Sequence, residues 1–373
     1  MTSSRHVSEF RTRIVAFLFP WIHLLSQGRR RLGILFLLFE ALSGYVLTHG
    51  MLRSTTDALL APYEGLSILV AVILIDIIGR FLCLISVTRA RTRSYMESYS
   101  RIISRRLSRD PKGILGLLVL GGFVFLVLVA PLISSDPLVM NFGAVLQKPS
   151  TTYLLGTDMY GRDVFSRIVY GTRYTLGIAV TATALNILLG ATLGLVAGYF
   201  RGAIDAILMR ILEILNSIPF LMLAILIVAM FGSSTSLLIV VLSVFVLQPA
   251  RIVRSQVLEL REKDYIKAAR AIGATPIRII SCHLLPNTVG TLLVVASIRV
   301  GQNILSLAGL SFLGMGITPP TPSWGSMLQE GRSVILQCPW LGIFPGMAIF
   351  ATVLAFNLVG DSLRDALDPR LKL

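Results

Sequence analysis

The sequence predicts an all-α polytopic membrane protein, and three observations lead to this fold class. Of the 373 residues, 54% are hydrophobic and only 14% are charged, whereas about a quarter of the residues of a soluble globular protein are charged. The mean hydropathy is +0.78. Apolar runs of roughly 20 residues, long enough to cross a hydrocarbon core about 30 Å thick, recur along the chain. These runs are expected to be helices, because a helix satisfies its backbone hydrogen bonds internally where water is absent.

The apolar runs predict eight spans, arranged as an N-terminal pair followed by six. The pair lies at 32–52 and 65–87, and a basic linker at 89–112 follows it. This linker divides the chain into an N-terminal extension, 1–108, and a six-helix membrane domain, 109–373. The six spans of that domain are expected at 113–133, 176–199, 206–230, 237–249, 287–312 and 340–359.

The net charge of +15 reflects basic residues that cluster in short links between the apolar runs. This distribution follows the positive-inside rule, so both termini are expected in the cytoplasm. The basic linker at 89–112 is expected to lie on the anionic lipids of the inner leaflet. Because the cations do not gather on a folded soluble surface, no nucleic acid is expected as a partner.

A polar and basic stretch from Arg251 to Pro286 interrupts the apolar series. Gly273 is expected to divide it into two short helices, since glycine tolerates backbone angles that other residues resist. Pro286 is expected to start the next span, where its missing N–H costs little. Ala268 and Ala269 would allow another helix to approach closely. The stretch therefore predicts a cytoplasmic docking element, and an interfacial amphipathic helix joining two spans remains the alternative.

This stretch resembles the EAA-type coupling loop (251–286 in this chain) of the membrane subunits of ABC importers. The family pattern is Glu-Ala-Ala, three residues, Gly, nine residues, an apolar residue, one more residue, and Leu-Pro. The spacing agrees throughout, although Lys267 and His283 depart from the pattern in residue type. Asp264 and Tyr265, and the run HLLPN that begins at His283, are typical of the dipeptide, oligopeptide and nickel branch. The matching positions are Lys267, Ala268, Ala269, Gly273, His283, Leu285 and Pro286.

Three further segments resemble the same branch. They are LGTDMYGRDVFSR at 155–167, LSFLGMGITPPTPSWG at 310–325 and the tail GDSLRDALDPRLK at 360–372. Their order is similar to that of the C-type permease, one of two unlike membrane subunits. Leu307 departs from the branch, because an acidic residue is expected just before the second segment.

The resemblance implies a permease subunit of an ATP-driven importer in a bacterial cytoplasmic (inner) membrane. Such a subunit forms half of a pathway for short peptides, or for nickel or another small solute. The implied partners are a second related permease, two ABC ATPase subunits, an extracytoplasmic substrate-binding protein and membrane lipids. The chain has no G-x-x-x-x-G-K-[ST] phosphate loop, so ATP and Mg²⁺ are expected in the partner ATPases. No enzymatic activity, catalytic residue, cofactor or metal is expected in this chain.

A second candidate site lies in the external segments. Asp158, Arg162 and Asp163 stand among glycines, a mixture suited to a tight, ion-paired turn. Trp324, in the proline-rich segment PPTPSWG, suits an anchor at the membrane interface. These four residues predict either an external gate or binding-protein contact, or a structural cap on the helices, and the sequence leaves both open.

Two rival functions remain at this stage. Asp76 and Arg80 lie four residues apart within a predicted span, and Glu40 lies within another. Ionisable residues in a membrane mark functional sites by default, so an ion-coupled transporter or channel is one alternative. It would need no ATPase and would be expected to show inverted repeats, which the sequence does not reveal. The other alternative is a scaffold in which the N-terminal pair recruits a partner and the permease core is inactive.

Overall fold

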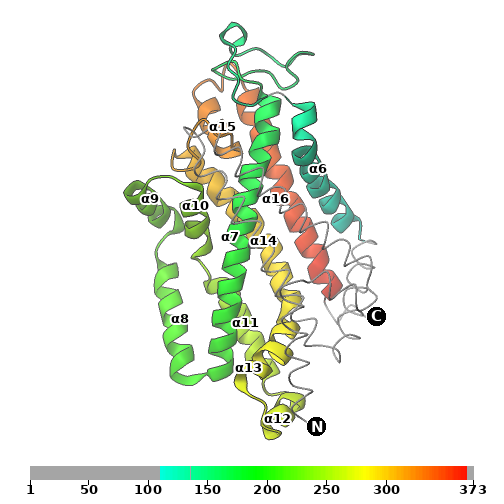
Figure 1. Cartoon of the computed structure of the whole chain (residues 1–373), viewed down its shortest axis with the longest axis vertical. Coiled ribbons are helices and arrows are strands. Elements are labelled where there is room, and N and C mark those ends of the chain that lie inside the picture. Colours follow the sequence, from blue (N-terminus) through cyan, green and yellow to red (C-terminus); the bar gives the residue numbers. More distant parts are fainter. Residues whose placement is uncertain (1–109, 135, 368–373) are drawn as a thin grey trace, which may run out of the picture. The chain divides into compact units, whose positions relative to one another are not determined.

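The computed structural model describes residues 110–134 and 136–367, and helices dominate these ranges (Figure 1). Within them the only β pairing is a single bridge between Thr157 and Asp163. The predicted all-α fold class is confirmed. The N-terminal pair of spans and its ionisable residues lie outside the described residues. The division at residue 108 therefore stays a prediction.

The described helices fall into long and short groups. The long ones are α6 (Pro111–Ile133), α7 (Val164–Phe200), α14 (Leu285–Phe312) and α16 (Trp340–Leu367). The short ones are α8 (Gly202–Ser217), α9 (Phe220–Phe231), α10 (Thr235–Ser243), α11 (Leu247–Leu260), α12 (Asp264–Ala271), α13 (Pro276–Ile279) and α15 (Trp324–Arg332). A 3₁₀ turn covers Phe142–Ala144 and a π-helical turn covers Ile280–Leu284.

Four stretches of the described chain are long and apolar enough to cross a membrane, namely α6, α7, the run Pro276–Phe312 and α16. Two further candidates are bent pairs, with 81° between α8 and α9 and 40° between α10 and α11. If each pair is one span, the described residues contain the six spans expected for 109–373. The break between α8 and α9 falls at Ile218 and Pro219, because proline disfavours a helical conformation in the residue before it.

Several boundaries differ from the sequence prediction. α7 begins at Val164 rather than near residue 176, because the Asp163 carboxylate caps it by accepting the Ser166 N–H at 3.0 Å. α11 runs to Leu260, so the first third of the polar stretch 251–286 continues the helix of a span. α15 lies within the segment predicted as an external loop, and a capping box between Ser323 and Ser326 starts it.

Among the described helices, α7 and α11 pack against each other most extensively. Gly190, Gly194 and Gly198 recur every four residues and therefore line one face of α7. A Cβ atom on Gly194 would lie 2.5 Å from the carbonyl oxygen of Ala250 and 2.9 Å from the Cβ of Val253. The glycines thus allow the two backbones to approach to a distance that a side chain would prevent.

Gly194→Ala should destabilise the protein by about 1–3 kcal/mol, because the added methyl group overpacks the contact with α11. Gly177→Ala on the same helix is the matched control, since a Cβ there meets nothing within 4 Å. The control should be neutral or stabilising by about 1 kcal/mol, the usual gain from replacing a helical glycine. Thermal unfolding in detergent measures both variants. Equal stability of the two would contradict the close contact.

The departure at Leu307 has a structural explanation. Leu307 is 1% exposed and belongs to an apolar cluster with Leu238 and Leu310. A carboxylate at this position would need a buried partner. Leucine instead completes the core between α14 and α10.

Candidate functional site

The predicted docking stretch forms a compact loop at one end of the helices, where α12 and α13 lie (Figure 1). Gly273 has φ +81° and ends α12. Its N–H donates to the Arg270 carbonyl at 2.9 Å, and the Ala274 N–H donates to the Ala269 carbonyl at 3.0 Å. This pair of bonds is a Schellman motif, which requires a left-handed residue at the position of Gly273. The predicted glycine break is confirmed.

The inner face of this loop is packed against the spans. Ile266 and Ile279 are fully buried and cluster with Val253 of α11 and Leu284 at the start of α14. Ala269 is also buried, at 7% exposure, so it contributes to the fold of this chain. The inner face therefore ties α12 and α13 to two spans.

Two arginines fasten the same loop to the end of α7. The Arg261 Nη1 donates to the Tyr199 carbonyl at 2.7 Å. The Arg270 guanidinium lies 5.2 Å from the centroid of the Tyr199 ring. Burial, together with the charges of Arg201 and Arg270, lowers the pKa of Arg261. Arginine remains charged at physiological pH, so the loop is held by a cation as well as by apolar contacts.

The outer face of the loop exposes large apolar side chains. Ile272 is 86% exposed and Ile277 is 79% exposed, and they lie on either side of Gly273. Tyr265, in the first turn of α12, is 46% exposed. The same segment carries exposed cations at Lys267 and Arg278. Exposed apolar groups rimmed by polar residues are typical of a protein interaction surface.

The other predicted loop residues fall on both sides of α12 and at the start of α14. Asp264, Lys267 and Ala268 are exposed. The Tyr265 ring lies 6.3 Å from the ring of His283, centroid to centroid. Leu285 and Pro286 occupy the first turn of α14.

Pro286 lies in the first turn of α14, as expected, but the helical run of this span extends further back than the sequence predicts. A continuous helical run begins at Pro276, and Pro286 lies inside it, directly after the π-helical turn Ile280–Leu284. Proline removes one backbone donor and its ring crowds the preceding turn. A wider π-helical turn is a common way for a helix to absorb such a local irregularity.

At the opposite end of α14, four charged side chains form a largely buried ion cluster. The Asp158 Oδ2 atom accepts from Arg162 Nε at 2.6 Å and from Arg167 Nη1 at 2.5 Å. Glu330 of α15 accepts from Arg162 Nη2 at 2.9 Å and from Arg167 Nη1 at 2.6 Å. The two arginines are 3% and 2% exposed. Two cations and two anions share this site, so its charges balance.

The tight turn predicted around Asp158 holds the cluster in position. The Asp158 Oδ1 atom accepts the backbone N–H groups of Tyr160 at 2.8 Å and Arg162 at 3.0 Å. Gly161 has φ +71°, and a Cβ there would lie 1.8 Å from the carbonyl oxygen of Asn141. Only glycine fits this backbone conformation and this contact. Asp163 does not join the cluster, because its carboxylate caps α7.

Sequence reasoning missed Arg167 and Glu330 as members of this site. A signal was available in the charges. Once Asp163 serves as a helix cap, the motif at 155–167 holds two arginines and one remaining aspartate. A buried set of this kind needs another acid, and Glu330 is the sole acidic residue in 313–339.

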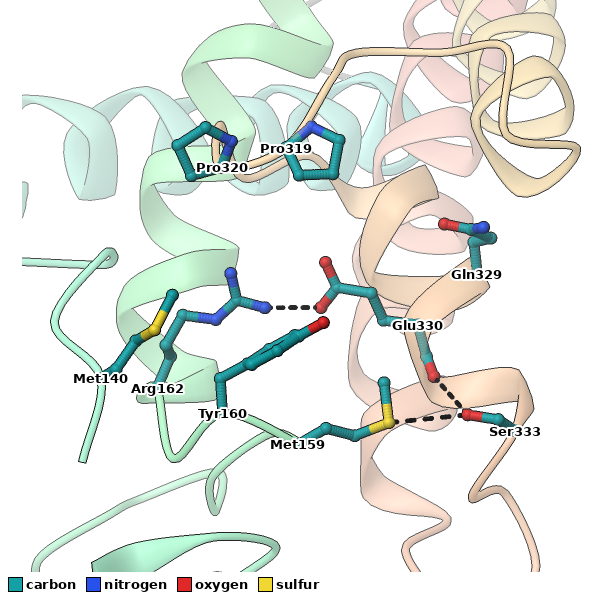
Figure 2. Close-up of a pocket in the computed structure, with 9 residues that line it drawn as sticks. All are labelled: Met140, Met159, Tyr160, Arg162, Pro319, Pro320, Gln329, Glu330 and Ser333. Carbon is teal, nitrogen blue, oxygen red and sulfur yellow. Dashed lines mark hydrogen bonds and ion pairs between the residues drawn. The ribbon is translucent and has the colours of Figure 1, made fainter. Parts of the chain in front are cut away.

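A pocket of about 570 Å³ lies against this cluster (Figure 2). Arg162 and Glu330 form part of its wall, and the Arg162 guanidinium lies 4.6 Å from the centroid of the Tyr160 ring. Figure 2 shows Arg162 and Glu330 pointing toward each other, and below them the Ser333 hydroxyl donates a hydrogen bond to the Met159 sulfur. The remaining lining residues are Met140, Pro319, Pro320 and Gln329.

The structure corrects the prediction of Trp324 as an interfacial anchor. Trp324 is fully buried at the start of α15. Its Nε1 donates to the Ile168 carbonyl of α7 at 3.1 Å, and its ring lies 5.5 Å from that of Phe123 of α6. Trp324 thus holds α15 against two spans and presents no surface to a partner. Its contacts come from distant parts of the chain and could not be read from the local motif.

The described residues include no group of three or more His, Cys, Asp or Glu side chains suited to a metal ion.

Comparison with known proteins gives a consistent result. A family model described as a binding-protein-dependent transport system inner membrane component matches residues 190–373, a range that contains α12, α14 and α16.

Three curated relatives extend the match beyond this range. The chain is 42% identical over 270 residues to a dipeptide transport system permease protein, DppC, of Alkalihalophilus pseudofirmus, covering 72% of this chain and 89% of the relative. It is 45% identical over 233 residues to a glutathione transport system permease protein, GsiD, of Pectobacterium atrosepticum, covering 62% and 77%. A putative peptide transport system permease protein of Brucella abortus is 42% identical over 274 residues, covering 73% and 92%. Each of the three is named as a permease protein of a transport system.

Proposed function

The chain belongs to the family of binding-protein-dependent transport system inner membrane components, and we propose that it forms half of the solute pathway of a short-peptide importer. It is a multi-pass membrane protein and a permease subunit of an ABC importer. The observation that carries the proposal is the two-sided loop at α12 and α13. Its inner face is buried against the spans, whereas its outer face exposes Ile272 and Ile277.

The outer face of this loop is the docking surface for a separate ATPase. ATP-driven movement of the ATPase would push on α12. Ile266 and Ile279 would pass this displacement to α11 and α14, because they pack against residues of both. Arg261 would pass it to α7 through the Tyr199 carbonyl. Transport on this account needs no covalent step in this chain, and ATP and Mg²⁺ are held by the ATPase.

The complete assembly proposed here contains this chain, a second related permease, two ATPase subunits and an external binding protein. The distribution of Lys and Arg residues supports the proposed orientation, in which the loop and both termini lie in the cytoplasm of a bacterial cell. The stretch 251–286 carries seven Lys and Arg residues, whereas the segment 313–339 carries only Arg332. The seven are Arg251, Arg254, Arg261, Lys263, Lys267, Arg270 and Arg278.

The proposed solute is a short peptide or a small peptide-like molecule. Relatives that match most of their length to this chain are named for dipeptide, glutathione and peptide transport. We take the pocket bounded by the ion cluster and by Met140 and Met159 as the candidate point at which a binding protein would release the solute.

The test is uptake by the purified complex in proteoliposomes, with labelled trialanine and the binding protein outside and ATP inside. We expect uptake that requires the binding protein and ATP together. Uptake that follows an ion gradient without ATP would instead identify an ion-coupled transporter. Absence of any co-purifying ATPase would also contradict the proposal.

A further inference from the structure

Arg299 lies midway along α14, a helix that belongs to a candidate membrane span. It is the fifteenth of the 28 residues of α14 (Leu285–Phe312), which places it roughly 20 Å from either end at 1.5 Å per residue. A charged residue at this depth is costly in hydrocarbon and usually marks a pathway or a paired site.

The hydrogen-bond partners of Arg299 in the described chain are neutral. Its Nε donates to Asn186 Oδ1 of α7 at 3.4 Å, and its Nη1 donates to Gln302 Oε1 at 3.1 Å. Its Nη2 donates to the Phe245 carbonyl, at the break between α10 and α11. Among the residues that the structure describes, no carboxylate pairs with Arg299. Its positive charge is therefore solvated by dipoles but not neutralised.

Asn186 explains why this arrangement is firmly held. Its side chain is fully buried, and its Nδ2 donates to the carbonyls of Ser243 at 3.1 Å and Phe245 at 2.9 Å. These are the carbonyl groups left free where α10 ends. Broken helices in transporters commonly use such unwound backbone to build a solute site near the middle of the membrane.

The guanidinium retains the capacity to bind an anion. It has five N–H donors, and three of them have acceptors in the described chain. One N–H remains on each Nη atom, and a carboxylate can accept two such donors side by side. Gln302, the next polar residue on this face, is exposed and Arg299 is partly exposed, so an anion can reach the group.

We propose that Arg299 and Gln302 form a subsite that binds a carboxylate of the transported solute midway along the pathway. The inference rests on the proposed function, because it requires that this face of α14 line the solute pathway. A peptide with a free C-terminus supplies the required group. The carboxylate of the bound solute would neutralise Arg299. When the solute has left, only the hydrogen bonds to Asn186, Gln302 and Phe245 would stabilise the guanidinium.

The experiment compares uptake of trialanine with that of its C-terminal amide. The same binding protein is used for all permease variants, so that any preference of the binding protein between the two peptides cancels when the variants are compared. Gln302→Glu is the decisive variant. It changes shape little, keeps Arg299 in position and supplies a carboxylate within the subsite. We expect it to reduce trialanine uptake by about tenfold to a hundredfold, as for loss of a hydrogen bond to a charged group. Uptake of the amide should change less than about twofold, within the small effects that uncoupled sites show.

Arg299→Gln should abolish the preference for trialanine over its amide, because it removes the positive charge. Arg299→Lys should retain part of that preference. Arg210→Gln is the matched control, because this arginine is 77% exposed on α8. Thermal unfolding of each complex separates transport effects from misfolding. If Arg299→Gln fails to assemble, Gln302→Glu still decides the question, since it preserves the bonds to Asn186 and Phe245.

An unchanged preference in Gln302→Glu would overturn the subsite and leave Arg299 as a structural clamp, or as the pair of a carboxylate on the second permease. Equal loss of both peptides in that variant would overturn it as well. Failure of the unmodified complex to take up either peptide with ATP would instead overturn the proposed function, and the subsite with it.

Discussion

Glu330→Gln should lower the free energy of unfolding by about 3–5 kcal/mol, the usual cost of removing one member of a buried ion pair. Glu330 accepts from both Arg162 and Arg167, which are almost fully buried. The substitution leaves Asp158 as the single anion between two cations. One positive charge then remains without a partner in a largely buried site.

Unfolding of the purified protein by heat or by denaturing detergent measures this loss. Glu262→Gln is the matched control, because Glu262 is 56% exposed and pairs with Arg201 at 3.0 Å on the surface. The control should cost less than about 1 kcal/mol. Similar losses in the two variants would show that the cluster does not depend on its charges.

The same variant distinguishes the two roles left open for this region. If the cluster is a structural cap, the transport rate of the folded fraction should be unchanged. If it is part of an external gate, the variant should hydrolyse ATP without the binding protein, because ATP hydrolysis would no longer depend on docking of the binding protein at the gate. ATPase assays with and without the binding protein decide between them.

Substituting Ile272→Asp and Ile277→Asp together should detach the ATPase subunits from the permease. Both side chains are mostly exposed, so the change should leave the fold of this chain intact. A docking surface of this kind derives its energy from a few large apolar groups, and losing two of them should cost about 2–4 kcal/mol of binding. That corresponds to roughly a thirtyfold to thousandfold weaker complex.

Co-purification of the ATPase with a tagged permease measures the effect. Leu336→Asp is the matched control, since Leu336 is 97% exposed but follows α15 at the other end of the helices. The control should retain the ATPase. Retention by the double variant would contradict docking at this loop, whereas loss from both variants would indicate a general defect in assembly.

The sequence predicted the order of the helices because each span must be apolar over a fixed length. It also located the break at Gly273, since the small-residue run and the glycine are local signals. The face that each residue presents was not accessible in the same way. Ala268 and Ala269 are adjacent, yet one is exposed and the other is buried, because successive helical residues differ by about 100° around the axis.

Features that depend on distant contacts were the least predictable. Trp324 has the local context of an interfacial anchor, but Ile168 and Phe123 surround it in the fold. Glu330 is far from Arg162 in sequence, and only the surplus of positive charge in the motif pointed to a missing acid. The bend at Pro219, in contrast, could have been read from the proline itself.

The contact between α7 and α11 allows α11 to act as a rigid lever, so that movement of one end of the helix moves the other end. This helix extends about 20 Å at 1.5 Å per residue, from the break beside Phe245 to the loop that carries α12. The glycines of α7 face α11 from Pro249 to Val257, so the two backbones lie close along most of that helix and α11 would move as a rigid unit. A small tilt imposed at the loop would therefore swing the opposite tip, which carries the backbone that holds Arg299. Force applied on one side of the membrane would in this way loosen or tighten the grip on a solute at its centre.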